Sequence, residues 1–513
     1  MWQLFKSKSV KFASGITKQT SLVFILLNAQ LSISQPVAAK KNIQGIYAQS
    51  ALPNQLKHTN SVCPAQLGTV IDKIIDRPQF TRSRWGIVVQ KLNNAQNLYS
   101  RDADKYFIPA SNLKLLTTAA ALQKLGANFR FRTSIYGTDS GLLRVVGRGD
   151  PSLTDVQLTA LARQLKLTGV RQIVYLGVES DRFADDIISP DWEWGDIQAD
   201  YGAPIGSLII NQNAVTFQLL PQQVGQPLRL VWQDPIAARQ WQVDNQSLTA
   251  KPKSPAQIVV NRNLSGILQI KGQLSPDSPP ESVTLAVINP AENFVQHLRR
   301  VLLVAGIADN SDRVRLNIVE VQKQLATAPE LAAINSPPLS QLLIETNQNS
   351  NNLYAEALLR ALGSRVNFAD SNAQKGLLAV KQALTTLGVD PTGYVLADGS
   401  GLSRHNLATP KAIAQTLNAM AKSPQAAIYR ASLPIAGVSG TLKNRLQGKL
   451  TQGIVSAKTG TISGAIGLSG YIDSPNYEPL VFSIIVNQSA RPTTVLRQAV
   501  DEIVVNLASL RRC

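Results

Sequence analysis

Three short strings in the chain carry side chains that could together perform acyl transfer. Ser111 and Lys114 stand three residues apart in the first string, S-N-L-K. The second string, S-N-N, supplies Ser350 and Asn352, and the third, K-T-G-T, begins at Lys458. A serine hydroxyl attacks a carbonyl when a neighbouring group removes its proton, and an amine can do this without a metal or a histidine. These residue types therefore predict a serine nucleophile with a lysine base.

The helix expected around the first string would place the lysine beside the serine. Apolar residues recur at helical spacing from 113 to 125, and Gly126 follows as a C-cap. Residues three apart share a helix face, and free N–H groups in the first turn favour an oxyanion. A lysine with an ordinary pKa of about 10.4 is protonated at neutral pH. Burial, or a second cation such as Lys458, must therefore lower the pKa of Lys114.

The third string is expected to end a strand. Residues 454–458 read as a strand that ends at Lys458, and a second strand at 464–472 follows a short turn. Gly460 would let a substrate backbone approach this edge closely. The first two strings alone are weak signals, since S-x-x-K occurs on surface helices and S-N-N resembles a helix N-cap, whereas K-T-G is more specific. Their combination, each at the end of a predicted element, indicates one site.

The three strings resemble the signature of penicillin-binding proteins and class A β-lactamases, S-x-x-K, S-D-N and K-T-G. Two more strings, D-G-S-G-L-S at 398–403 and G-D-P-S-L at 149–153, narrow the resemblance. With the long interval between the first and second motifs, they point to low-molecular-mass class C penicillin-binding proteins, the D-alanyl-D-alanine carboxypeptidase/endopeptidase family. Asn351 stands where this family often has Asp, and its side chain is expected to point away from the pocket.

The resemblance implies a serine D,D-peptidase of peptidoglycan stem peptides. Ser111 would attack the carbonyl between two D-alanines, and Lys114 would take its proton. Ser350 would relay a proton to the leaving amine with Lys458 beside it, and Asn352 would hold the substrate and the lysine. β-Lactam antibiotics mimic the same dipeptide, so they are expected to acylate the serine and inhibit the enzyme.

The same resemblance assigns substrate-binding residues. Thr459, Gly460 and Thr461 would receive the terminal carboxylate, and the N–H groups of Ser111 and Thr461 would form the oxyanion hole. Asp196 would bind a cationic centre of the substrate side chain. The alternative for Asp196 is a solvated loop acid near two tryptophans.

The fold that the resemblance implies is α/β, the serine β-lactamase/penicillin-binding-protein-like transpeptidase fold: a five-stranded antiparallel sheet flanked by helices and split by a β-rich insertion. The strand patterns agree, because a hairpin at 85–100 and strands near 455, 468 and 484 require both ends of the chain. The predicted parts are a signal peptide at 1–39, a split catalytic domain at 40–132 and 328–513, and inserted β-rich domains at 133–327.

The first 39 residues predict export to the periplasm or cell envelope. They contain four lysines and no acid, then an apolar run at 22–27 and small residues at 37–39, which is typical of a cleaved signal peptide. An uncleaved anchor is the alternative, but the run is much shorter than the roughly 20 residues of a membrane span. The formal charge of +18 suits an anionic cell-wall partner, and the sequence lacks the aromatic interleaving typical of RNA-binding surfaces.

The chain has two cysteines, Cys63 and Cys513. In the family that the chain resembles, the terminal helices pack side by side, which implies that the two chain ends lie close together. Outside the cytoplasm this proximity predicts a Cys63–Cys513 disulfide.

Other hydrolase templates fit poorly. The chain has no H-E-x-x-H or G-x-S-x-G string, and its three histidines with two distant cysteines do not match a familiar zinc site, so no metal or cofactor is expected. His405 with Asp398 and Ser403 could be imagined as a triad, although a solvated loop histidine is favoured. A β-lactamase and a non-catalytic wall-binding scaffold of the same fold are the remaining alternatives. The preference between terminal dipeptides and cross-links stays open, as does the oligomeric state.

Overall fold

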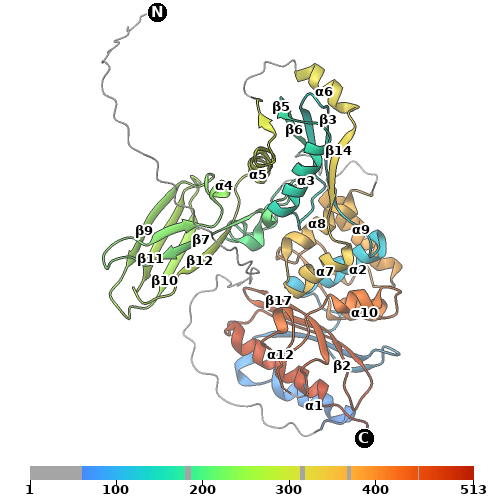
Figure 1. Ribbon diagram of the computed structural model, residues 1–513. Coiled ribbons are helices and arrows are strands. Elements are labelled where there is room, and N and C mark those ends of the chain that lie inside the picture. Colours follow the sequence, from blue (N-terminus) through green and yellow to red (C-terminus); the bar gives the residue numbers. More distant parts are fainter. Residues whose placement is uncertain (1–60, 180–186, 312–317, 367–370, 449) are drawn as a thin grey trace, which may run out of the picture. The chain divides into compact units, whose positions relative to one another are not determined.

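The computed structural model describes residues 61–179, 187–311, 318–366, 371–448 and 450–513. The predicted signal peptide at 1–39 lies outside these residues. A five-stranded antiparallel sheet in the order β17-β18-β19-β1-β2 takes strands from both ends of the chain (Figure 1). Its strands are β1 (Arg84–Lys91), β2 (Asn97–Arg101), β17 (Val455–Ile462), β18 (Ala465–Ile472) and β19 (Leu480–Asn487).

The sequence pattern predicted these strands, with one error in the third string. The hairpin of β1 and β2 and the strands β18 and β19 are confirmed. The strand expected to end at Lys458 instead continues to Ile462, so the K-T-G-T string lies inside β17. Ladder pairing with β18, in which Gly460 lies opposite Gly467, extends the strand through the glycine. Local propensity could not predict this continuation, because it comes from a partner strand.

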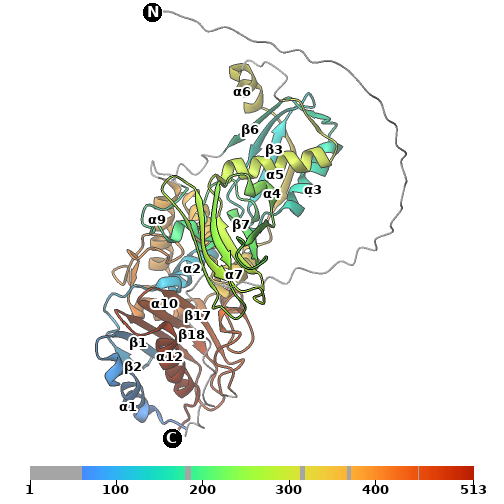
Figure 2. The ribbon, with the colours of Figure 1, turned by 90° about the vertical axis from the view of Figure 1, so that its left-hand side faces the viewer.

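Helices cover both faces of this sheet. Helix α10 (Pro410–Ala421) packs in the core on one face and α12 (Thr493–Ala508) in the core on the other, and Figure 2 shows both beside β17 and β18. Alternation along β1 sets the two cores, because Ile87 and Val89 face one side while Val88 faces the other. The first core contains α1 (Pro64–Ile75) and α12 (Thr493–Ala508). The second contains α2 (Lys114–Leu125), α7 (Leu339–Gln348), α8 (Asn352–Gly363), α9 (Asn372–Thr386), α10 (Pro410–Ala421) and α11 (Ala426–Ala431).

The two described chain ends meet beside the first core. Helices α1 and α12 pack against each other, and a disulfide joins Cys63 to Cys513 across 450 residues of sequence. Backbone hydrogen bonds from Val62 to Ser509 and from Arg511 to Val62 lie next to it. The predicted pairing of the cysteines is therefore confirmed.

Between β2 and β17 the chain builds further sheets with their own cores. One four-stranded sheet packs against α3 (Asp155–Leu167) and α5 (Pro290–Val304). It contains β14 (Glu330–Asn335), β3 (Arg132–Gly137), β4 (Leu142–Val146) and β6 (Tyr175–Glu179). Strand β14 lies after residue 327 and pairs with β3, so chain on both sides of the predicted domain limit shares one sheet. The domain limits themselves stay a prediction.

Two three-stranded sheets enclose a further core. They are formed by β7 (Ala214–Leu220), β8 (Arg229–Trp232) and β12 (Glu281–Ala286), and by β9 (Val243–Thr249), β10 (Gln257–Arg262) and β11 (Leu268–Leu274). The shorter elements are α4 (Pro235–Ala238), α6 (Ile318–Ala326), β5 (Gln172–Ile173), β13 (Ala308–Asp309), β15 (Tyr394–Val395) and β16 (Leu407–Ala408). Across the described parts of the chain, no helix has the length and apolar character needed to cross a bilayer.

Candidate active site

Ser111 lies in a 3₁₀ turn, Ala110–Leu113, that leads directly into α2. Helix α2 ends at Leu125 with Gly126 as C-cap at φ 79°, as the sequence predicted. Ala110, next to the serine, has a left-handed φ of 48°, a conformation that costs a non-glycine residue about 1 kcal/mol or more. Full burial of Ala110 holds this conformation in place. The turn thus fixes the serine at the sheet-facing end of the helix.

The side chain of Lys114 is completely buried and reaches three oxygen atoms. Its Nζ lies 3.0 Å from Ser111 Oγ, 2.6 Å from Asn352 Oδ1 and 2.7 Å from the carbonyl oxygen of Ser400. Carbonyl oxygens only accept hydrogen bonds, so a neutral amine donates its two hydrogens to Asn352 and Ser400. Its lone pair then faces the hydroxyl of Ser111. The neutral amine matches this geometry without an unsatisfied hydrogen.

Burial also lowers the pKa of Lys114 to about 7, although the nearby carboxylates of Asp398 and Glu356 raise it. Taking an ammonium group out of water disfavours its charged form. The amine is therefore available as a base near neutral pH, which the sequence analysis required of it.

The second string stands at the start of α8. Ser350 has a left-handed φ of 58°, and Asn351 is the N-cap, accepting a hydrogen bond from the Tyr354 N–H. The Asn351 side chain also donates to Glu345 and Gln212. An Asn here performs the same capping role as an Asp would.

Asn352 connects the lysine with the segment around residue 200. Its Oδ1 accepts from Lys114, while its Nδ2 donates to the carbonyl oxygen of Tyr201 at 2.8 Å. This donor and acceptor on one amide fix the orientation of its side chain.

The third string brings a second buried amine. Lys458 Nζ lies 2.8 Å from Ser350 Oγ and 2.8 Å from the carbonyl oxygen of Thr459. Burial, and then the positive charge of Lys114, lower the pKa of Lys458 well below its ordinary value. Two ammonium groups in one dry pocket repel each other, so the pocket disfavours the doubly protonated state.

The outer edge of β17 faces this pocket. The Ala457 N–H donates to Pro434, away from β18, which marks the outward direction. N–H groups two residues apart point the same way along a strand, so those of Thr459 and Thr461 share this edge. Gly460 is required for close approach, because a Cβ there would lie 2.7 Å from the carbonyl oxygen of Pro109. The string therefore packs directly against the turn that carries the serine.

Asp196 lies in a 3₁₀ turn (Asp196–Gln198) and is half-buried. It accepts a hydrogen bond of 3.1 Å from the Tyr201 hydroxyl, and burial raises the pKa of its carboxyl. Its link to the three strings runs through Tyr201, whose carbonyl accepts from Asn352. The structure thus brings the three strings into direct contact and places Asp196 one residue further away.

The imagined histidine triad does not form. His405 is an exposed side chain, and its Nδ1 lies 2.9 Å from Asp191. Asp398 accepts instead from the Ser403 backbone N–H at 2.6 Å. The favoured interpretation of His405 as a loop histidine agrees with this exposure.

The sequence did not reveal that Glu356 raises the pKa of Lys114 by its charge, or that the Ser400 carbonyl accepts a hydrogen bond from the Lys114 amine. Glu356 stands four residues after Asn352, one helical turn along α8, and this spacing was the available signal for a second functional side chain. A backbone carbonyl acceptor such as that of Ser400 has no signature in residue types. Arg497, from α12, donates to the Thr461 hydroxyl at 3.4 Å and was also missed.

Comparison with protein-family models matches residues 67–509 to the D-Ala-D-Ala carboxypeptidase 3 (S13) family. The chain belongs to this family. Two curated relatives support the membership. The D-alanyl-D-alanine carboxypeptidase of Actinomadura sp. (strain R39) is 34% identical, over 85% of this chain and 84% of that protein. The D-alanyl-D-alanine carboxypeptidase DacB of Haemophilus influenzae is 30% identical, over 79% of this chain and 85% of that protein.

Solved structures show the fold of the family. The crystal structure of penicillin binding protein 4 from Haemophilus influenzae matches with a TM-score of 0.73 and 26% identity, covering 85% of this chain and 98% of that one. The same protein complexed with a β-lactam matches with a TM-score of 0.68 and 25% identity, covering 87% and 99%. The expected penicillin-binding-protein-like fold with a five-stranded antiparallel sheet is confirmed.

Proposed function

We propose that this member of the S13 family is an exported serine D,D-peptidase that cleaves the bond after a penultimate D-alanine in peptidoglycan stem peptides. Relatives named D-alanyl-D-alanine carboxypeptidase, and the β-lactam complex of a related penicillin-binding protein, support the substrate class. The observation that carries the proposal is Lys114. Its buried amine donates to two carbonyl oxygens and turns its lone pair to Ser111.

The acylation step uses this arrangement. Ser111 Oγ forms a bond to the carbonyl carbon of the penultimate D-alanine while its hydroxyl proton passes to Lys114. The N–H groups of Ser111 and Thr461 stabilise the oxyanion, an effect of roughly 3 kcal/mol per donor in other acyl-transfer enzymes. The C–N bond then breaks, and the leaving amine takes a proton through Ser350, which lies in contact with Lys458. Water hydrolyses the resulting ester and restores the serine.

The assignments of substrate contacts rest on the family motif. Thr459, Gly460 and Thr461 receive the terminal carboxylate, and Asp196 meets a cationic side chain of the stem peptide. The half-buried position of Asp196 beside Tyr201 supports this role, since a carboxylate with part of its hydration removed binds a cation more strongly.

Export to the periplasm or cell envelope belongs to the same proposal. The disulfide between Cys63 and Cys513 supports an oxidising compartment, where such bonds persist. The basic, signal-like segment at 1–39 gives a route out of the cytoplasm.

Labelling with a fluorescent penicillin tests the function. The wild-type protein is expected to carry a long-lived label and the Ser111→Ala variant none. Failure of both to label would support a non-catalytic scaffold, and rapid loss of the label from the wild type would support a β-lactamase. Mass analysis of products from defined muropeptides then decides between terminal dipeptides and cross-links, because release of free D-alanine identifies the carboxypeptidase.

A further inference from the structure

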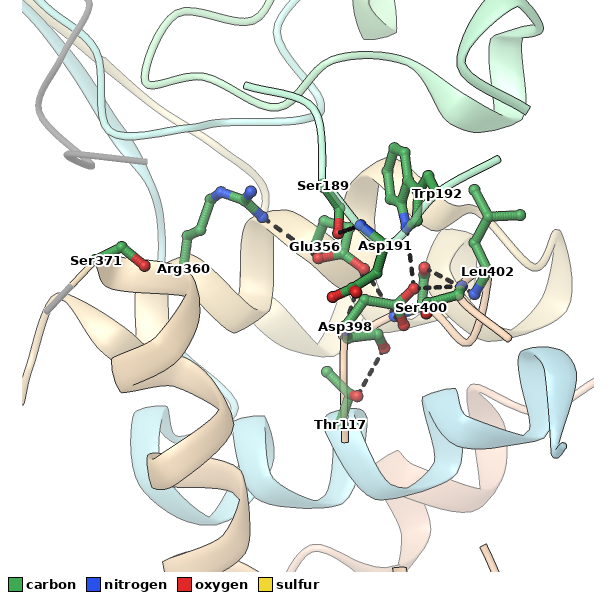
Figure 3. A network of polar contacts seen from close by, with 12 residues as sticks. Thr117, Ser189, Asp191, Trp192, Glu356, Arg360, Ser371, Asp398, Ser400 and Leu402 are labelled. Carbon is green, nitrogen blue, oxygen red and sulfur yellow. Dashed lines mark hydrogen bonds and ion pairs between the residues drawn. The ribbon is translucent and has the colours of Figure 1, made fainter. Parts of the chain in front are cut away.

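Figure 3 shows a polar network around Glu356, Asp398 and Ser400 that the reaction described above does not use. It contacts Lys114 through the carbonyl oxygen of Ser400. Glu356 is 2% exposed, and its Oε1 accepts the N–H groups of Gly399 and Ser400 at 2.9 Å each. Its Oε2 lies 3.3 Å from the guanidinium of Arg360 on the next turn of α8. The carboxylate therefore links the helix that carries Asn352 to the loop at 398–403.

Asp398 holds the same loop from inside. Its Oδ1 accepts the N–H groups of Ser400 and Gly401 at 3.1 and 2.7 Å, and its Oδ2 accepts that of Ser403. The indole N–H of Trp192 donates to the same carboxylate at 3.0 Å. These hydrogen bonds to one buried carboxylate restrain the conformation of the loop.

The loop matters because it presents the Ser400 carbonyl to Lys114 at 2.7 Å. The hydroxyl of Thr117, one turn along α2, donates to the carbonyl of Gly399 at 2.7 Å. A Cβ at Gly401 would lie 2.0 Å from the Ala110 carbonyl oxygen, so the loop also packs against the turn that carries the serine. Small movements of this loop would displace one of the two acceptors of the lysine amine.

The two carboxylates also act on the lysine through their charge. Burial lowers the pKa of Lys114, while Asp398 and Glu356 oppose that fall and hold it at about 7. Arg360 faces Glu356, and Lys458, whose pKa is lowered by burial and then by the charge of Lys114, is the second amine of the pocket. Burial and the charge of Asp398 raise the pKa of Glu356 itself to about 7.

We propose that Glu356 is a positioning residue that, with Asp398, sets the proton affinity of Lys114 through the 398–403 loop. Without this anionic support the amine would lose its proton at lower pH, and the enzyme would be tuned to more acidic conditions. The inference rests on the proposed serine peptidase function, in which neutral Lys114 is the base.

The test is the pH dependence of acylation by a fluorescent penicillin in Glu356→Gln. The amide oxygen of Gln can still accept from Gly399 and Ser400, so the loop keeps its acceptor while the charge is removed. The midpoint of the acid limb of the acylation rate is expected to move towards lower pH by about half a pH unit. The shift is smaller than a permanent charge would give, because Glu356 itself has a pKa of about 7 and is ionised in only part of the molecules there. Glu356→Asp, which keeps the charge, is expected to retain the wild-type midpoint at a reduced rate.

Asp234→Asn serves as the control, because it neutralises a half-buried carboxylate at the N-cap of α4, which is far from Glu356 along the chain. It is expected to lower thermal stability without moving the acid limb.

If Glu356→Gln lowers stability but leaves the midpoint in place, its role is merely structural and the proposal is wrong. If Glu356→Gln does not fold, Asp398→Asn gives the same readout, and an unmoved midpoint there also overturns it. Wild-type protein that does not label would instead contradict the proposed function.

Discussion

Lys114 and His297 are both buried basic groups with two carboxylates in their surroundings, but their pKa values shift in opposite directions. His297, on α5, lies in direct contact with Asp155 at 2.7 Å and Asp234 at 3.0 Å. Burial alone would lower its pKa, but the two carboxylates outweigh burial and raise it. Around Lys114 the carboxylates stand behind a peptide loop, and burial prevails.

The difference shows how distance decides whether a buried base titrates. A direct ion pair holds a proton on the imidazole and links α3, α4 and α5. Carboxylates that oppose burial without a direct ion pair leave the pKa of the Lys114 amine at about 7, so the amine can both take and release a proton near neutral pH. The first arrangement suits structure, and the second suits proton transfer.

Replacing each cation should separate these roles, beginning with the lysine. Lys114→Met keeps the length of the side chain and removes the base, so β-lactam acylation is expected to fall by about 10⁴-fold. Stability is expected to stay level or rise, since a buried amine is replaced by an apolar group. Labelling kinetics and thermal unfolding measure the two effects. Lys124→Met, exposed on the same helix, is the control, and equal labelling of both variants would contradict the assignment.

His297→Gln should give the reverse result. Loss of the imidazolium leaves two carboxylates without their cation, which is expected to cost about 3 kcal/mol in the free energy of unfolding. The labelling rate of the folded fraction should not change. Chemical denaturation at pH 6 measures the loss, and His405→Gln, on the exposed histidine, is expected to cost little. A stable His297→Gln variant with slower labelling would abolish the comparison.

The two cations should also impose opposite pH dependences on stability. The raised pKa of His297 contributes stability that is complete below the unfolded value of about 6.5 and is lost as pH rises through the folded value. The lowered pKa of Lys114 is a penalty that is complete below pH 7 and disappears as pH rises from about 7 towards 10.5. The free energy of unfolding of the wild type minus that of His297→Gln should therefore fall as the pH rises from 5 to 10. The same difference for Lys114→Met should rise.

Asp196 should have the smallest effect, confined to one class of substrate. Asp196→Asn is expected to reduce cleavage of a peptide with a free side-chain amine by about tenfold, because it removes one charge-assisted contact. Acylation by a penicillin that lacks this amine should be unchanged. Asp277→Asn, an exposed acid of the inserted region, is the control. An equal loss on acetylated and free-amine peptides would remove the proposed role.

The sequence was informative where chemistry depends on residue type and short spacing. Ser111 with Lys114 on one helix turn and the capping Asn351 follow from local rules, whereas the pairing of Cys63 with Cys513 followed from the family resemblance. The mid-strand position of Lys458 could not be predicted, because strand β18 supplies the pairing that extends β17. The loop at 398–403 was noted only as a string, since the contacts from Glu356 that make it rigid join separate segments. His297 was only one of three histidines that match no zinc site, because its two acids lie on other elements.

The sheet that needs both ends of the chain has a consequence for biosynthesis. Cys513 follows its disulfide partner Cys63 by 450 positions. Until the final strands emerge, Lys114 has no dry pocket and would keep the ordinary proton affinity of a solvated lysine. A polypeptide in which β17–β19 have not yet been made therefore lacks this base, and the site is completed only when both halves of the sheet have been synthesised.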